Sequence, residues 1–270
     1  MTKEERLNLF HDECKKSLNN LAGLKEVTPH LFYYDNSYAK PIADYFAERG
    51  IESKELDFKN GSPFLPMCSL TSSARLCFLY FYNKDNHSDY LYEQSYRIVK
   101  ENGGVLTHAH PDAIKGDYYY ECKCQEVVNG EGEKLKKSYL ACAKYFKEIF
   151  ANLNEIKSDK EYLYFRLDNL NINLNYQYNE AQINVKQLIC HLLALANKAE
   201  ETKREQHLQY IIFVPNNYQD IEEIYASLQN EIKMIFESDN NLIRFANAHS
   251  IKIEKPMLIP IGEVKDPFIK

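Results

Sequence analysis

The sequence predicts an α/β protein in which a mixed sheet is flanked by helices. Residues 105–113 and 118–128 have the composition of two β-strands, and the short connection between them contains Gly116. Apolar residues at helical spacing follow at 181–198, and 207–214 is a nearly continuous apolar run, which is typical of a buried strand. A helix before this group, and the order strand, strand, helix, strand within it, indicate helices layered on a sheet.

Length, composition and charge narrow the class of protein. A chain of 270 residues suits one domain, or one domain with an appendage, and its 44% hydrophobic and 13% aromatic content gives it ample apolar surface to bury. The 33 Lys and Arg against 39 Asp and Glu leave a formal net charge of -6. This balance excludes a strongly basic nucleic-acid binder recognised by bulk charge, although it leaves room for a local basic face.

The cysteines and the start of the chain predict a cytoplasmic protein. The seven cysteines are odd in number and lack the spacing of a disulfide framework, which indicates reduced thiols. The first residues run into an amphipathic pattern that contains acids, unlike the apolar segment of a secretory signal. No run approaches the roughly 18 apolar residues of a membrane span, so we expect no membrane partner.

Residues 1–60 are expected to form an N-terminal helical extension that packs on the core. Thr2 and Glu5 have the spacing of a capping box, which predicts a helix from the start of the chain. A second helix is expected at 37–49 and a short strand at 51–58.

Residues 61–270 are expected to form the main domain, with an insertion at about 129–180. More helices are expected before and after the two strands, and the C-terminal part adds a helix and an edge strand. The segments are predicted helices at 74–82, 88–101, 133–153 and 220–238 and a predicted strand at 251–261.

Charged side chains gather on the two predicted strands. Side chains alternate across a strand, so Glu121, Lys123 and Gln125 share one face of the second strand. Asp112 lies near the end of the first strand. If the strands pair as a hairpin with these faces together, two carboxylates and an ammonium converge.

This combination predicts metal-dependent chemistry on a phosphate. Asp112 and Glu121 are hard oxygen ligands suited to Mg²⁺ or Mn²⁺, and the backbone carbonyl of Cys122 could supply another oxygen. Lys123 could stabilise charge that builds on the phosphate, or help orient or deprotonate the attacking water. We therefore expect a hydrolase that acts on phosphodiesters.

The motif Pro111-Asp112 and Glu121-Cys122-Lys123, with eight residues between the two acids, resembles that of the PD-(D/E)xK nuclease superfamily. The resemblance implies a restriction-endonuclease-like fold, in which the acidic positions bind the metal and the lysine assists catalysis. It also implies a DNA endonuclease of restriction or repair type, with DNA as partner and Mg²⁺ or Mn²⁺ as cofactor. A homodimer would suit the cutting of both strands.

The resemblance covers about residues 72–214. Gln125 is similar to the polar residue often found two places after the lysine in that family, and it is expected to orient its neighbours. Many family members add an acid from a helix before the hairpin, and Glu93 is the candidate for this third metal ligand.

Several other side chains could contact nucleic acid. Lysines on a helix more commonly lie on its solvated face, and histidines in a strand are more commonly partly buried without a binding role. The predicted helix at 181–198 also offers glutamines that could face the site. The candidates are His108, His110, Lys134, Lys137, Lys144 and Lys186, together with Gln182 and Gln187.

Two other functions compete with the nuclease. His108, His110 and Asp112 resemble part of the metal signature of metallo-β-lactamase-like hydrolases, because two histidines at i and i+2 can bind one zinc. Ala113 stands where that signature has its last histidine. A nuclease-like module that binds nucleic acid or protein without cutting is the third hypothesis.

Overall fold

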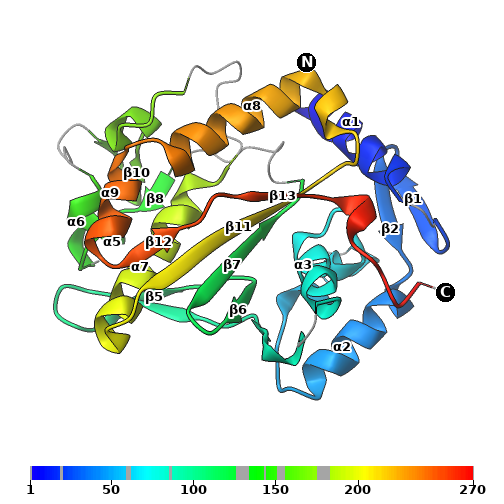
Figure 1. The fold of residues 1–270 in the computed structure, drawn as a ribbon, viewed down its shortest axis with the longest axis horizontal. Coiled ribbons are helices and arrows are strands. Elements are labelled where there is room, and N and C mark those ends of the chain that lie inside the picture. Colours follow the sequence, from blue (N-terminus) through cyan, green and yellow to red (C-terminus); the bar gives the residue numbers. More distant parts are fainter. Residues whose placement is uncertain are drawn as a thin grey trace.

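A mixed sheet lies at the centre of the molecule between helices, so the mixed α/β class is confirmed (Figure 1). The computed structural model describes residues 2–18, 21–58, 62–84, 87–125, 134–142, 144–150, 156–174 and 183–269. The strand order is β12-β11-β7-β6-β3, and β13 also pairs with β11. These strands are β3 (Leu91–Tyr92), β6 (Ala113–Lys115), β7 (Tyr118–Lys123), β11 (Gln206–Val214), β12 (Ile251–Ile253) and β13 (Met257–Pro260).

The central strand is β11, where a buried strand is predicted. It pairs in parallel with β7 on one side and with β12 and β13 on the other, and Figure 1 shows it crossing the middle of the molecule beside β7. Leu208 and residues 210–214 are all buried. A parallel strand covered on both faces needs apolar side chains on both, which explains the continuous run. The edge strand predicted at 251–261 is found as β12 and β13.

The strands β6 and β7 form the predicted antiparallel hairpin. Lys115 pairs with Tyr118, so Gly116 and Asp117 alone make the turn. Gly116 has a φ of +61°, a left-handed conformation that glycine adopts without steric cost and that two-residue hairpin turns require.

The strand predicted at 105–113 is instead divided between two sheets. β5 (Val105–Ala109) pairs with β4 (Tyr96–Val99) in a separate two-stranded sheet, whereas β6 begins only at Ala113. Pro111 lies between β5 and β6. It has no amide hydrogen to donate to a neighbouring strand, and it restricts the backbone of the residue before it, so a continuous strand is disfavoured there.

Residues 88–101 form the strands β3 and β4, so the predicted helix is wrong. Tyr96, Ile98 and Val99 are aromatic or β-branched, and such residues favour strands. Gly103, with a φ of +84°, lies in the turn that joins β4 to β5. The backbone of β4 makes its hydrogen bonds with β5, and the helical spacing of apolar residues gave no sign of this pairing.

Two helices cover opposite faces of the central sheet. α3 (Ser73–Tyr82) begins where predicted, with the Ser72 hydroxyl accepting a 3.2 Å hydrogen bond from the amide of Arg75. α7 is Val185–Thr202, and its first residues contact Glu121. The next residue of β7, Cys122, faces Cys77 of α3. The alternation of side chains along β7 therefore separates the two helices.

The N-terminal region carries the predicted capping box, with Thr2 and Glu5 bonded reciprocally. It is not wholly helical, because a hairpin separates its helices. The predicted strand at 51–58 contains a short 3₁₀ turn, Lys54–Leu56, in place of a strand. The regular elements are α1 (Lys3–Lys16), β1 (Leu24–Thr28), β2 (Leu31–Tyr34) and α2 (Lys40–Ala47).

The stretch predicted as an insertion holds a small sheet of its own, in the order β8-β10-β9. The single helix predicted at 133–153 is found only in part: Leu135 pairs with Leu163 across β8 and β10, and two short helices follow within the described residues of this range. Cross-strand pairing here overrides a helical pattern of apolar residues. The elements are β8 (Lys134–Lys136), α5 (Ser138–Cys142), α6 (Phe146–Ile149), β9 (Lys157–Ser158) and β10 (Tyr162–Tyr164).

The C-terminal part adds helices and then ties back to α3. α8 (Glu222–Ile232) runs into a π-helical turn at Lys233–Glu237, and α9 (Asn241–Ala248) follows. Beyond β13, Asp266 lies 3.4 Å from the buried guanidinium of Arg75. No helix in the described part of the chain is long and apolar enough to cross a membrane.

Candidate metal and catalytic site

Glu121 and Lys123 lie on the face of β7 that α7 covers. They are 1% and 8% exposed, and the ammonium of Lys123 donates to Oε1 of Glu121. Two charges this deep are stable only when they are paired, because each loses its hydration on burial. The alternation predicted from the sequence therefore places an acid and a base in direct contact.

The first turns of α7 complete the surroundings of Glu121. The side-chain amide of Gln187 donates to the same Oε1 at 2.5 Å, and Nε2 of His191 lies 2.8 Å from Oε2. Gln187 and His191 are four residues apart, so they lie on one face of the helix. The side chain of Asn184 caps the helix, because its Oδ1 accepts a 3.0 Å hydrogen bond from the backbone amide of Gln187.

Glu121 is ionised in this setting. Burial raises the pKa of its carboxyl, but the charges of Lys123 and His191 and their contacts lower it further, so the net pKa lies below the ordinary value. The hydroxyl of Tyr210 is buried and has no hydrogen-bond partner among the described residues. Tyr210 is paired with Glu121 across the parallel register of β11 and β7. We call Glu121, Lys123, Gln187, His191 and Tyr210 the α7 cluster.

Asp112 is fixed at the start of β6 beside the same stretch of β7. Its amide donates to the carbonyl of Tyr120 at 2.9 Å, and its Oδ2 accepts from the amide of Cys122 at 2.7 Å. Burial, and then the negative charge of Glu121, raise the pKa of Asp112 well above its ordinary value, although Lys123 acts in the opposite direction. Asp112 is therefore close enough to Glu121 and Lys123 for their charges to act on it.

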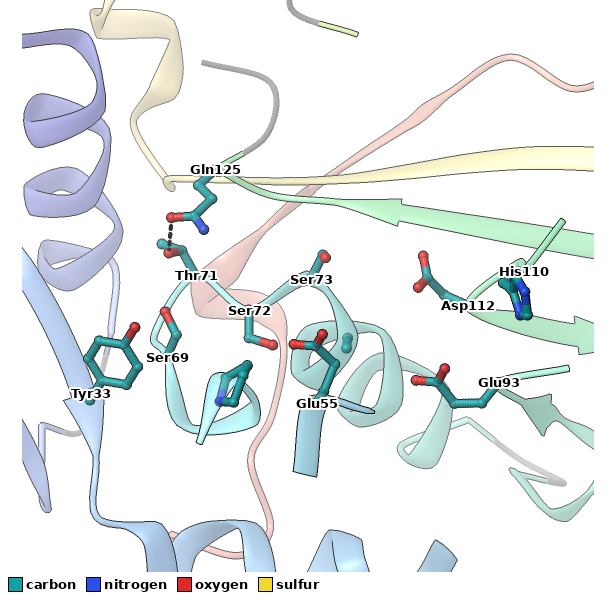
Figure 2. A pocket seen from close by; sticks show the side chains of 12 residues that line it. Tyr33, Glu55, Ser69, Thr71, Ser72, Ser73, Glu93, His110, Asp112 and Gln125 are labelled. Carbon is teal, nitrogen blue, oxygen red and sulfur yellow. Dashed lines mark hydrogen bonds between the residues drawn. The ribbon is translucent and has the colours of Figure 1, made fainter. Parts of the chain in front are cut away.

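A cavity of about 330 Å³ opens in front of Asp112. Figure 2 shows the carboxylates of Asp112, Glu93 and Glu55 directed toward one space, with Ser73 at its edge. A second cavity, of about 930 Å³, shares Glu55, Glu93 and His110 with the first, so the two form one acidic depression.

Glu93, the candidate third acid, therefore lines the same cavity as Asp112. It sits between β3 and β4 rather than on a helix, and its Oε1 accepts from the Ser53 hydroxyl at 2.9 Å. Its φ of +54° is unusual for a residue with a side chain, and such conformations persist where the surrounding structure imposes them.

Gln125 also lines the cavity, and the N-terminal extension holds it. Its Oε1 accepts from the Thr71 hydroxyl at 3.0 Å, as Figure 2 shows, and lies 2.9 Å from Nε2 of His11 on α1. Nδ1 of His11 donates to the carbonyl of His30 at 2.9 Å. We call His11, Thr71 and Gln125 the α1 cluster. It fixes the side chain that was predicted to orient its neighbours.

The two predicted histidines lie apart from the metal face. His108 is an exposed residue of β5 that pairs with Arg97, and it does not share a strand with Asp112, because Pro111 interrupts the chain. His110 is exposed and lines the cavity with Asp112. Their ring centres are 6.4 Å apart. Burial, and then the charge of His108, lower the pKa of His110.

The predicted lysines do not form a basic face at the site. Lys144 pairs with Glu200, Lys137 donates to the carbonyl of Asp159, and Lys134 lies over the ring of Tyr162. Lys186 is exposed on the first turn of α7, and Gln182 lies outside the described residues. Sequence reasoning proposed Gln187 and missed His191, Tyr210 and His11. The i, i+4 spacing of Gln187 and His191 was the one feature of the sequence that could have indicated that both side chains face the same neighbour.

Comparison of the chain with protein-family models, with curated proteins and with solved structures finds no match. Within the described residues, no group of three or more His, Cys, Asp or Glu side chains is arranged to hold a metal ion. The donors present nevertheless suit Mg²⁺ or Mn²⁺, because Mg²⁺ is commonly bound through one or two carboxylates and keeps several waters. The carboxylate oxygens of Asp112 and Glu121 are ligands of this kind.

Proposed function

We propose that this protein is a metal-dependent nucleic-acid phosphodiester hydrolase with a restriction-endonuclease-like core, and that DNA is its substrate. One observation carries the proposal: Asp112, Glu121 and Lys123 gather beside one hairpin, β6–β7. Later in the chain, α7 covers β7 and the strand β11 pairs in parallel with it. The resemblance to PD-(D/E)xK nucleases implies such a helix and strand.

The proposed metal ligands are Asp112 and Glu121, with the backbone carbonyl of Cys122 beside them and Glu93 across the cavity. When bound, Mg²⁺ or Mn²⁺ would polarise a phosphate oxygen and lower the pKa of a coordinated water. Asp112 is preset for this role, because the amide of Cys122 holds one of its oxygens. Burial, and then the negative charge of Glu121, raise the pKa of Asp112, and a bound cation would offset that negative charge.

Lys123 would place its ammonium beside the reacting phosphate. Glu121 holds the ammonium, and Gln187 supports the same carboxylate oxygen, so the amine is oriented before substrate arrives. An oriented charge stabilises a developing negative charge without reorganisation. Gln125, fixed by the α1 cluster, would orient groups at the other side of the cavity.

The zinc-hydrolase alternative gains less support from the geometry. A catalytic zinc site uses three protein ligands, whereas His108 is separated from Asp112 by the break at Pro111 and lies on another sheet. The hypothesis of a non-catalytic binding module involves the same residues as the nuclease proposal and differs only in the absence of activity. A cleavage assay therefore decides between these two hypotheses.

The test is cleavage of plasmid, linear duplex, single-stranded DNA and RNA with Mg²⁺ or Mn²⁺. We expect DNA cleavage that falls by about 100-fold or more in Lys123→Met and in Asp112→Asn, because each removes a group that acts on the reacting phosphate or its metal. Lys40→Ala is the matched control, since Lys40 is exposed on α2 and pairs with Asp44. It should cleave like the wild type.

Two results would contradict the proposal. Cleavage that survives both site substitutions would assign the activity to a contaminant or to other residues. Nucleic-acid binding without cleavage under any metal would favour the non-catalytic module. Cleavage of RNA alone would keep the chemistry and change the substrate.

A further inference from the structure

The groups proposed to act on the phosphate lie below the molecular surface. Glu121 and Lys123 are 1% and 8% exposed, and of the three groups Asp112 is the one that lines the cavity of about 330 Å³. A phosphate would therefore approach them through this cavity, past Asp112. A nucleotide inside a duplex enters such a recess only after it is unstacked and extruded, and an unpaired nucleotide does not carry that cost.

The mouth of the cavity is acidic, which disfavours a duplex further. The adjoining cavity of about 930 Å³ is lined by Glu52, Glu55, Asp57 and Glu93, with Lys54 as the lysine among its lining residues. Duplex DNA carries one negative charge per about 1.7 Å of its axis, which is about twice the density of one strand. Repulsion at this mouth is therefore stronger for a duplex than for a single strand, and affinity has to come from groups other than cations.

The end of the cavity away from Asp112 offers an aromatic ring. Figure 2 shows Tyr33 at that end, with Ser69 and Ser72 between it and Asp112. Tyr33 is partly exposed on β2, and its ring packs against that of Phe64 with the ring centres 5.1 Å apart. A ring held in this way is a surface on which a base can stack, and such stacking tolerates any sequence because every base has a π-face.

Neutral hydrogen-bond donors lie beside this ring. Oε1 of Gln125 accepts from the Thr71 hydroxyl and lies 2.9 Å from Nε2 of His11, so the amide NH₂ is the part of this side chain left to donate. The Ser72 hydroxyl oxygen accepts from the amide of Arg75, which leaves its own hydrogen to donate. Gln125 and Ser72 both line the cavity, and such donors can bind base edges and sugar oxygens without adding charge.

We propose that the substrate of this site is single-stranded DNA, and that one nucleotide enters the cavity with its base against Tyr33 and its phosphate at Asp112. This inference rests on the proposed function and adds the form of the DNA, which that proposal leaves open. Stacking on Tyr33 supplies binding free energy that the acidic mouth withholds from phosphate contacts. Sequence preference and salt dependence should therefore both be small.

The test begins with binding in the absence of cleavage. Fluorescence anisotropy of the full-length wild-type protein, with Ca²⁺ in place of Mg²⁺ or Mn²⁺, compares a labelled single-stranded DNA oligonucleotide with the duplex of the same sequence. We expect the single strand to bind at least about tenfold more tightly, because its nucleotides need no extrusion. This comparison needs no variant.

Variants of Tyr33 then test the stacking surface. Tyr33→Ala should weaken single-strand binding by about tenfold or more, the scale of one base–aromatic stack, whereas Tyr33→Phe keeps the ring and should stay within about twofold of the wild type. Tyr164→Ala is the matched control, since Tyr164 is exposed on β10 and does not line the cavity. In cleavage with Mn²⁺, the loss in Tyr33→Ala should appear in KM and leave kcat nearly unchanged. Circular dichroism checks that each variant folds.

The possible results separate this inference from the proposed function. Equal or tighter binding of the duplex, or single-strand binding that Tyr33→Ala leaves intact, would overturn the inference, and metal-dependent cleavage would still support the nuclease. Single-strand binding that depends on Tyr33, without cleavage under any metal, would overturn the nuclease and support the binding site. Failure to bind either form of DNA would overturn the inference, and the cleavage assay then decides the proposed function by itself.

Discussion

The α7 cluster includes residues of β7, whereas Gln125 of the α1 cluster lies two residues beyond the end of that strand, and the two clusters differ in how completely their hydrogen bonds are made. In the α1 cluster, Gln125 is held from two sides by Thr71 and His11. In the α7 cluster, the hydroxyl of Tyr210 is buried without a hydrogen-bond partner among the described residues. A satisfied network positions a side chain, whereas an unsatisfied one retains capacity to bind. The α1 cluster therefore positions Gln125, whereas the α7 cluster holds the groups proposed to act in the reaction.

The largest effect is expected from Glu121→Ala. The change removes the carboxylate that the buried ammonium of Lys123 contacts, and breaking a buried ion pair typically costs about 3–5 kcal/mol. Urea unfolding followed by circular dichroism measures the loss. Asp44→Ala, which breaks the exposed pair with Lys40, is the control and should change stability little. A loss below about 1 kcal/mol for Glu121→Ala would mean that Lys123 finds another partner.

A smaller loss is expected from His11→Ala. It removes the contacts to Gln125 and to the carbonyl of His30 and leaves that carbonyl without this donor, at a cost of about 1–3 kcal/mol. Mn²⁺ affinity should not change, because the α1 cluster does not contact Glu121. A fall in Mn²⁺ affinity together with stability would show that the two clusters are coupled, and calorimetry on the folded variant decides this.

Asp112→Asn should stabilise the protein at pH 7 by about 1 kcal/mol, a gain typical of relieving an active-site charge. The sign follows from the raised pKa of Asp112. An acid whose folded pKa lies above its unfolded pKa destabilises the fold at high pH, and that cost decreases as pH falls below the folded pKa and is gone below the unfolded pKa. The gain should therefore shrink in acid, and thermal unfolding between pH 4 and 8 measures it.

The pH dependence of stability expected from Glu121 has the opposite sign to that expected from Asp112. Its pKa is lowered, so its contribution to stability is present above the unfolded pKa and is lost as pH falls through the folded pKa. A stabilisation by Asp112→Asn that is constant with pH would show that the charge of Asp112 is not its cause.

The smallest effect is expected from Lys144→Ala. Its partner Glu200 is half exposed, and such surface pairs contribute less than about 1 kcal/mol. DNA affinity and its dependence on salt should also stay unchanged, because this lysine is already paired. A fluorescence anisotropy titration at two salt concentrations measures both quantities, and a weaker salt dependence would restore Lys144 as a phosphate contact.

The parts of the site that the sequence predicts are those governed by strand alternation. Glu121 and Lys123 had to share a face, and the turn at Gly116 follows from its backbone freedom. The helix at 88–101 was wrong and the helix at 133–153 was found only in part, because pairing with distant strands outweighs local spacing. His191 could not be recognised in advance, since its partner lies on another element and only the packing of α7 on β7 brings them together.

Both ends of the chain are bonded to residues nearly two hundred positions away. Ser17, just after α1, accepts from the amide of Asn216 at 2.7 Å, and Arg75 at the head of α3 is paired with Asp266. Such contacts close very long loops, which slows folding. During synthesis, the pair between Arg75 and Asp266 can form only after the chain has been made as far as Asp266. The head of α3 therefore gains this ion-pair partner late, after the strands of the central sheet have been made.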